Sequence, residues 1–259
     1  MAKETTSKTL LVAASLCIVC SVLVSTAAVK LKPIQEKNKA LSTKKNILMV
    51  AGLTQEGKSV DELFKKIEVK VVDLATGEYD SSVDASSFDQ KAAAKDPAKN
   101  VVIPANLDIA KIRTRAKKAV VYLVKEQGKI ETIILPLHGK GLWSTMYAFL
   151  ALEKDGNTVK GYSFYDHGET PGLGGEVDNP SWKAQWVGKT MFDSHWNVSV
   201  DLVKGKVNPD KPEAIHQVDG LAGATLTTVG VENLTRYWLG DHGFGKFLSR
   251  IRKGGQENG

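Results

Sequence analysis

The uncharged stretch at residues 9–29 constrains the fold of this chain more than any other feature. It reads TLLVAASLCIVCSVLVSTAAV, and Lys8 and Lys30 flank it. A helix of about 20 apolar residues spans the hydrocarbon core of a bilayer, so we expect one transmembrane anchor that follows a tail of residues 1–8. A cleaved signal peptide is the alternative, because residues 25–28 are small, but the apolar run is longer than the usual core of a signal peptide.

Both cysteines of the chain, Cys17 and Cys20, lie inside this stretch. Two cysteines exclude a disulfide scaffold. No histidine or further cysteine lies nearby, so the pair is predicted to be small apolar filler and not a redox or metal site. Lysines on both sides leave the orientation open. The positive-inside rule alone keeps the following domain in the cytoplasm, yet long domains translocate largely regardless of charge.

The composition is that of a folded globular protein, with 42% hydrophobic and 25% charged residues among 259. The net charge of +6 accompanies no groove-reading motif, so no nucleic-acid partner is expected. Residues 30–100 are predicted to form a juxtamembrane region. We expect a helix over 31–52, a short helix over 61–67, a strand over 69–74 and a polar loop or marginal helix over 81–100.

Residues 101–259 are predicted to form one α+β domain, with a mainly antiparallel sheet and flanking helices. The expected strands cover 101–103, 119–124, 131–137, 146–154, 158–167 and 198–203. A helix is expected over about 226–238. Parallel βαβ alternation is missing from the pattern, which disfavours a Rossmann dinucleotide fold.

Two glycine-rich segments follow expected strands and are candidate binding loops. In residues 138–145 (HGKGLWST), Gly139 and Gly141 beside Leu142 and Trp143 suit close approach of the backbone to a flat ligand. The alternative is a tight turn with a core tryptophan. Residues 166–175 (DHGETPGLGG) are too long for a hairpin turn and are typical of a binding loop. This second loop lacks a third metal ligand at suitable spacing, so no metal site is predicted.

A third glycine-rich segment, residues 219–228 (DGLAGATLTT), precedes an amphipathic run. Small residues leave the backbone exposed at a helix start, where free N–H groups and the helix dipole favour a phosphate. The segment is not a Walker loop, because the Gly-Lys-Ser/Thr ending is missing. The alternative is a helix capped by Thr225 or Thr227, which explains one threonine but not the small residues before it.

This third segment resembles the flavinylation motif of FMN-binding domains, D-G-x-[S/A]-G-A-[S/T]-x-T. The matching residues are Asp219, Gly220, Ala222, Gly223, Ala224, Thr225 and Thr227. Ala222 stands where serine is commoner. Residues 139–144 and 167–176 are also similar to that family. With the anchor and the chain length, nearly the whole chain resembles the C-subunit family of Na⁺-translocating NADH:quinone oxidoreductases, and least so over residues 81–100.

The resemblance implies FMN joined through its phosphate to Thr225 by a dedicated flavin transferase, in whose recognition Asp219 takes part. Residues of the two loops would contact the ring: Gly139, Gly141, Leu142, Trp143, Glu169, Thr170, Gly172 and Leu173. It also implies an electron-transfer subunit in a six-subunit Na⁺-pumping complex of a bacterial inner membrane, with the soluble domain in the periplasm. No nicotinamide fingerprint is present, so no NADH site is expected on this chain.

Two other functions stay open on the sequence. The homologous flavin subunit of a ferredoxin:NAD⁺ oxidoreductase complex has a similar anchor and motif, although the long region between anchor and hairpin favours the Na⁺ pump. The second open function is that of a membrane-tethered binding or assembly module without redox activity. In that case the threonine-rich start of the helix is only a cap.

Overall fold

The computed structural model describes residues 5–254, and the chain divides into two compact units, Met1–Thr43 and Lys44–Gly259. Helix α1 (Thr6–Val50) supplies most of the described part of the first unit and runs on into the second. It is the one helix within residues 5–254 that is long and apolar enough to cross a bilayer, and the side chains of its apolar stretch are exposed. Residues 1–4 of the expected tail lie outside the described part.

A six-stranded antiparallel sheet in the order β2-β1-β5-β6-β7-β8 forms the centre of the second unit. Its strands are β1 (Ile67–Asp73), β2 (Glu78–Tyr79), β5 (Lys118–Glu126), β6 (Lys129–Lys140), β7 (Thr145–Glu153) and β8 (Val159–Asp166). Two short pairs accompany it. The pair β3 (Asn100–Val102) and β4 (Thr114–Ala116) is antiparallel, and the pair β9 (Asp201–Val203) and β10 (Gln217–Asp219) is parallel.

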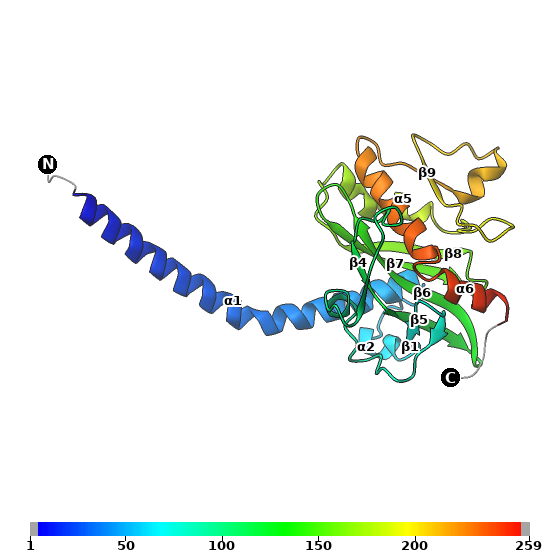
Figure 1. The fold of residues 1–259 in the computed structure, drawn as a ribbon, viewed down its shortest axis with the longest axis horizontal. Helices are drawn as coiled ribbons and strands as arrows, with labels where there is room; N and C mark the ends of the chain where they lie inside the picture. Colours follow the sequence, from blue (N-terminus) through cyan, green and yellow to red (C-terminus); the bar gives the residue numbers. More distant parts are fainter. Residues whose placement is uncertain (1–4, 255–259) are drawn as a thin grey trace. The chain divides into compact units, whose positions relative to one another are not determined.

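Short helices surround the sheet, and one long helix, α5 (Thr225–Leu239), lies along β6 (Figure 1). Val231, Leu234 and Trp238 of α5 are fully buried, and their spacing of three and four residues places them on one helix face. The remaining helices are α2 (Val60–Phe64), α3 (Gln90–Ala93), α4 (Pro180–Ala184), α6 (Gly245–Arg252) and the 3₁₀ turns η1 (Gly174–Asp178) and η2 (Pro212–His216).

Alternating side chains of the strands divide between two hydrophobic cores, because successive residues point to opposite faces of a sheet. On β7, Ala148 and Leu150 belong to the larger core, which the sheet shares with α5 and α6. Phe149 belongs to the smaller core on the other face, together with Ile47 and Leu48 from the end of α1. Both faces of the sheet are therefore covered.

The expected α+β class and mainly antiparallel sheet are confirmed. The sheet also reaches further towards the N-terminus than the expected domain start at residue 101, because β1 pairs with β5 along its whole length, from Ile67 opposite Val124 to Asp73 opposite Lys118. Over residues 81–99 the structure has one short helix, α3, within loop, and Asn100 begins β3. The expected strand over 198–203 is reduced to β9, and α6 was not expected from the sequence.

Candidate functional site

The three glycine-rich segments meet at the carboxylate of Glu169, which is only 5% exposed. Its oxygens accept hydrogen bonds from the backbone N–H groups of Leu142 (3.2 Å), Trp143 (3.0 Å) and Ser144 (3.2 Å). They also accept one from the hydroxyl of Thr227, at 2.6 Å. One carboxylate thus joins the turn after β6, the loop after β8 and the first turn of α5.

Two glycines leave the space that this carboxylate and hydroxyl occupy. A Cβ added to Gly141 would lie 2.5 Å from Oε1 of Glu169, and one added to Gly174 would lie 2.5 Å from Oγ1 of Thr227. Both distances are far below van der Waals contact, so any larger residue at either position displaces the group that holds the segments together. The glycine pattern in the sequence is explained here by internal packing.

Glu169 is ionised at neutral pH. Burial is the largest single influence on its pKa and raises it, but the hydrogen bonds from Thr227, Trp143, Ser144 and Leu142 together outweigh burial. The net result is a pKa below the ordinary value for a glutamate. Because all four hydrogen-bond donors belong to the turn after β6 and to α5, the contribution of this carboxylate to a ligand site is the arrangement of those segments.

Two further contacts fix the loop that carries Glu169. The ring of His167 accepts the N–H of Glu169 at Nδ1 (3.2 Å), which leaves Nε2 as the donor to Asp178 (2.9 Å). The hydroxyl of Ser144 accepts the N–H of Gly168 at 2.6 Å. The loop after β8 is therefore tied both to the turn after β6 and to η1.

Helix α5 begins at Thr225 without a side-chain cap. The N-cap residue is Ala224, and no side chain bonds to the first N–H groups of the helix. The alternative in which Thr225 or Thr227 caps the helix is wrong, since the N-cap residue is Ala224 and the Thr227 hydroxyl donates to Glu169 instead. The first turn contains no acidic residue, so the free N–H groups and the positive end of the helix dipole suit an anion such as phosphate.

The three threonines at this helix start have different environments. Thr227 is 1% exposed and bonded to Glu169. Thr228 is buried, and its hydroxyl accepts the N–H of Leu221 (2.9 Å) and donates to the carbonyl of Ala224 (3.1 Å). Thr225 is exposed, and its hydroxyl makes no hydrogen bond within the described residues. Thr225 therefore presents the one hydroxyl of the three that is available to a ligand.

The motif residues before the helix are held by packing. The carboxylate of Asp219 accepts the N–H of Val207 (2.8 Å), and its carbonyl accepts the indole N–H of Trp182 (2.8 Å). A Cβ on Gly220 would lie 2.6 Å from the carbonyl oxygen of Val203. Asp219 and Gly220 thus shape the backbone that leads into α5.

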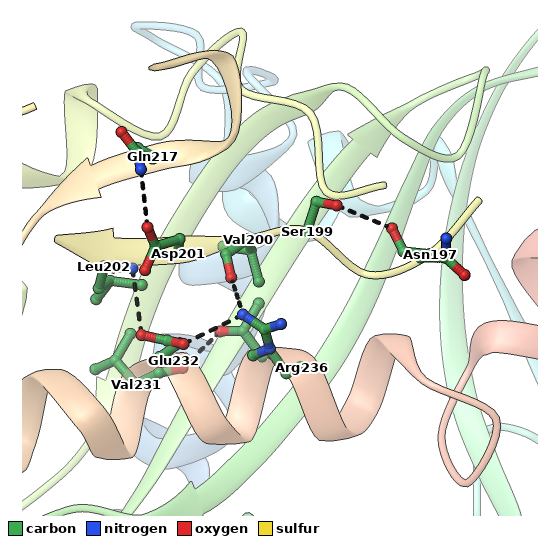
Figure 2. Close-up of polar contacts among 10 residues, drawn as sticks. Asn197, Ser199, Val200, Asp201, Leu202, Gln217, Val231, Glu232 and Arg236 are labelled. Atoms are coloured by element: carbon green, nitrogen blue, oxygen red, sulfur yellow. Dashed lines mark hydrogen bonds and ion pairs between the residues drawn. The ribbon is translucent and has the colours of Figure 1, made fainter. Parts of the chain in front are cut away.

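A polar network fixes β9 and β10 against α5 (Figure 2). Arg236 of α5 donates to the carbonyl of Val200 (2.7 Å) and to Glu232 (3.2 Å). Glu232 accepts the N–H of Leu202 in β9 (3.3 Å). Since β10 pairs with β9 and ends at Asp219, this network sets the position of the motif relative to its own helix.

Large apolar side chains are exposed around this junction. Trp143 is 67% exposed, so it is not the core tryptophan of the alternative interpretation, and Leu142 and Leu173 are 41% and 45% exposed. Leu226 and Val229 of α5 are also exposed, which was not expected. The sequence pattern that could have indicated this exposed pair is two apolar residues, three positions apart, on the helix face that does not pack against the sheet.

The other expected site residues fall into two groups. Gly223, with φ +71°, would place a Cβ 3.1 Å from the Leu173 side chain, which puts the motif beside the second loop. Thr170 and Gly172 are exposed on that loop. Gly139 and Ala224 lie inside, and a Cβ on Gly139 would clash with Leu234 of α5.

These residues fit the two ends of FMN. A flat apolar ring system suits the exposed side chains of Leu142, Trp143 and Leu173, which are displayed by glycine-rich loops. A phosphate suits the uncapped N-terminus of α5 and the free hydroxyl of Thr225. Within residues 5–254 no cluster of three or more metal-ligating side chains competes for this place.

Comparison with known proteins first gives the class. Residues 141–240 match the family model described as FMN-binding domain, and this range contains residues 141–145 of the first loop, the whole second loop and α5. The protein is thus a flavin-binding protein of that class. The C subunits of the Na⁺-translocating NADH-quinone reductase from Pseudomonas aeruginosa and Vibrio vulnificus are 53% and 52% identical to it, over 97% of this chain and 98% of theirs. The chain belongs to this C-subunit family of an oxidoreductase complex.

Solved structures agree with this assignment. The crystal structure of Shewanella oneidensis NqrC is 36% identical, has a TM-score of 0.76, and covers 84% of this chain and 99% of its own. The C subunit of the Na⁺-translocating NADH-quinone reductase from Parabacteroides distasonis is 26% identical with a TM-score of 0.65, covering 85% of this chain and 97% of its own.

Proposed function

We propose that this chain carries FMN in covalent linkage, through a phosphoester between the FMN phosphate and the hydroxyl of Thr225. The observation that carries the proposal is the exposed, unbonded hydroxyl of Thr225 at the uncapped start of α5, next to two threonines whose hydroxyls are buried and bonded. Bound FMN supplies reversible electron transfer, which a protein side chain does not. A covalent link retains that carrier on the subunit.

The ring of the flavin is placed between the turn after β6 and the loop after β8. Leu142, Trp143 and Leu173 supply the apolar surface, and the exposed backbone around Thr170 and Gly172 supplies hydrogen-bonding groups. The carboxylate of Glu169 fixes the positions of the two loops and α5 relative to one another through its hydrogen bonds, and it does not itself face the ring.

The protein acts within a larger membrane complex. Relatives named as C subunits of the Na⁺-translocating NADH-quinone reductase favour that complex over the ferredoxin-linked alternative. We assign the chain to a six-subunit assembly in a bacterial inner membrane, with α1 as a single anchor, the second unit in the periplasm, and a flavin transferase as the modifying partner.

Replacing Thr225 tests the linkage. Thr225→Val keeps the shape of the side chain and removes the hydroxyl, so co-expression with a flavin transferase is expected to give a folded protein whose intact mass lacks FMN completely. Thr225→Ser keeps a hydroxyl and is expected to retain the added mass. Covalent FMN on Thr225→Val would move the attachment elsewhere in the chain.

Replacing the exposed apolar residues tests the placement of the ring. Trp143→Leu and Leu173→Ala are each expected to retain covalent FMN while shifting its absorption spectrum and reduction potential. Both side chains are largely exposed, so the free energy of unfolding is expected to change by no more than about 0.5 kcal/mol. An unchanged spectrum and potential in both variants would place the ring elsewhere.

A C-terminal reporter tests the orientation. An enzyme that is active only outside the cytoplasm, fused after residue 259, is expected to be fully active. A second fusion to a reporter that works only in the cytoplasm is the control and is expected to be silent. The reverse result would show that the lysines around α1 set the orientation by the positive-inside rule.

A further inference from the structure

Residues 103–113, the loop between β3 and β4, have a backbone conformation that one aspartate maintains. Lys111 and Arg113 have φ angles of 53° and 65°, in the left-handed region that disfavours long side chains. The carboxylate of Asp108 accepts the N–H groups of Ile112 (2.9 Å) and Arg113 (2.8 Å), and its carbonyl accepts that of Lys111 (3.1 Å). A costly conformation that is held this firmly indicates a surface whose shape matters.

This loop is fixed beside the turn assigned to the flavin ring. The N–H of Lys140, the last residue of β6, donates to the carbonyl of Ala110 at 2.8 Å. Ala110 itself is buried, and its carbonyl lies 3.3 Å from where a Cβ on Gly139 would stand. Because the turn with Trp143 follows Lys140 directly, the loop and the turn occupy the same end of the sheet.

The loop presents both charge and apolar surface at that end. Lys111 and Arg113 are exposed, and their side chains make no ion pair or hydrogen bond with any residue in the range 5–254. Leu107 and Ile109 are 39% and 42% exposed. We define the docking face as Leu107, Ile109, Lys111 and Arg113, which lie beside the turn whose Leu142 and Trp143 are assigned to the flavin ring.

Exposed apolar side chains are concentrated at this end of the second unit. Among large hydrophobic residues exposed in residues 44–254, all but Met49, Val187 and Ile215 lie on β3, the 103–113 loop, the two glycine-rich loops or the start of α5. The proposed flavin covers Leu142, Trp143 and Leu173, but Leu107 and Ile109 stay exposed beside it, and exposed apolar side chains that cluster in this way are typical of a surface covered by another molecule.

We propose that the docking face binds the redox protein that donates electrons to the flavin of this chain, and that this donor presents an apolar patch bordered by acidic side chains. The inference rests on the proposed function, because the partner protein binds here only if this end of the domain carries the flavin. Lys111 and Arg113 are positively charged and unpaired in the described residues, so a complementary partner surface is negatively charged. A protein is favoured over a lipid surface because electron tunnelling weakens steeply with distance, so a redox partner must contact the end of the domain that holds the ring.

Charge reversal in the assembled reductase tests the proposal. The double variant Lys111→Glu/Arg113→Glu is compared with Lys129→Glu/Lys253→Glu, which makes the same change in net charge. Lys129 begins β6 and so lies at the end of the sheet opposite Lys140. Lys253 lies two residues after Ile251, and Ile251 packs on the turn after β7 near Gly156, at that same opposite end.

Each variant is measured in two ways. The intact mass of the subunit reports covalent FMN, and stopped-flow absorbance at low and at high salt reports the rate at which its flavin is reduced in the complex after NADH is added. Rates are compared in lipid-free detergent and in vesicles that contain anionic phospholipid.

We expect the Lys111/Arg113 variant to retain one FMN and to lose at least tenfold in rate in lipid-free detergent, with its dependence on salt reversed, while the control pair stays within twofold. Equal rates in the two variants would overturn the proposal, and an effect confined to anionic vesicles would overturn it in favour of a lipid surface. A protein without covalent FMN would instead contradict the proposed function.

Discussion

Glu169→Ala is expected to lower the free energy of unfolding of the soluble unit by about 3–5 kcal/mol, because it removes the acceptor of one buried and three part-buried hydrogen bonds. Three backbone N–H groups and the Thr227 hydroxyl would lose their partner, and water reaches them poorly at a position 5% exposed. Urea unfolding monitored by circular dichroism gives the change, provided that the slope with denaturant stays constant.

The matched control is Glu176→Gln, in the same part of the chain. Its carboxylate accepts a hydrogen bond from Asn179 at an exposed position, so a change within about 0.5 kcal/mol is expected. A loss for Glu169→Ala as small as that of the control would mean that the loops are held together by packing alone.

The same carboxylate makes stability depend on pH in a known direction. The pKa of Glu169 is lowered in the folded protein, so its contribution is fully present above the unfolded value of about 4.3 and is lost as pH falls through the folded value. Glu169→Gln removes this titration. The stability difference between wild type and this variant is therefore expected to shrink as the pH is lowered below about 4.

Local patterns in the sequence were sufficient for the strands and for the candidate loops. Short apolar runs bounded by turn residues predict β7 and β8, and the amphipathic run that ends at Trp238 predicts α5. The glycine-rich loops after β6 and β8 were predicted from composition alone. Each of these signals lies within a window of about ten residues.

The arrangement at Glu169 could not be predicted in this way, because its partners are distant in sequence. The acceptor and its donors are separated by 25 to 58 residues, and the burial that makes them matter depends on how β6, β8 and α5 pack. The exposure of a side chain to solvent cannot be predicted from local sequence either, because it also depends on how distant segments pack. A tryptophan after a strand is equally consistent with a core residue and a binding residue, and only the fold shows Trp143 in solvent.

The start of the folded unit also depends on contacts between residues distant in sequence, because the end of α1 packs on the sheet in the smaller core. A chain that begins at Lys44 is expected to fold with nearly full stability, since residues 44–259 form one compact unit. A chain that begins at Gly52 lacks Ile47, Leu48, Val50 and Ala51, all at most 3% exposed in the smaller core. Burial of each of the three large side chains contributes roughly 1.5–3 kcal/mol.

The summed loss of about 5–9 kcal/mol is comparable with the whole stability of a typical domain, so the shorter chain is expected to be unfolded or aggregated at 25 °C. Point variants of the Lys44 chain separate lost packing from the effect of a new terminus. Leu48→Ala is expected to cost about 2–5 kcal/mol, whereas Met49→Ala, at a side chain 46% exposed, is expected to cost less than about 1. Similar losses for the two variants would mean that the end of α1 contributes helix length and not a core, and the Gly52 chain would then be expected to fold.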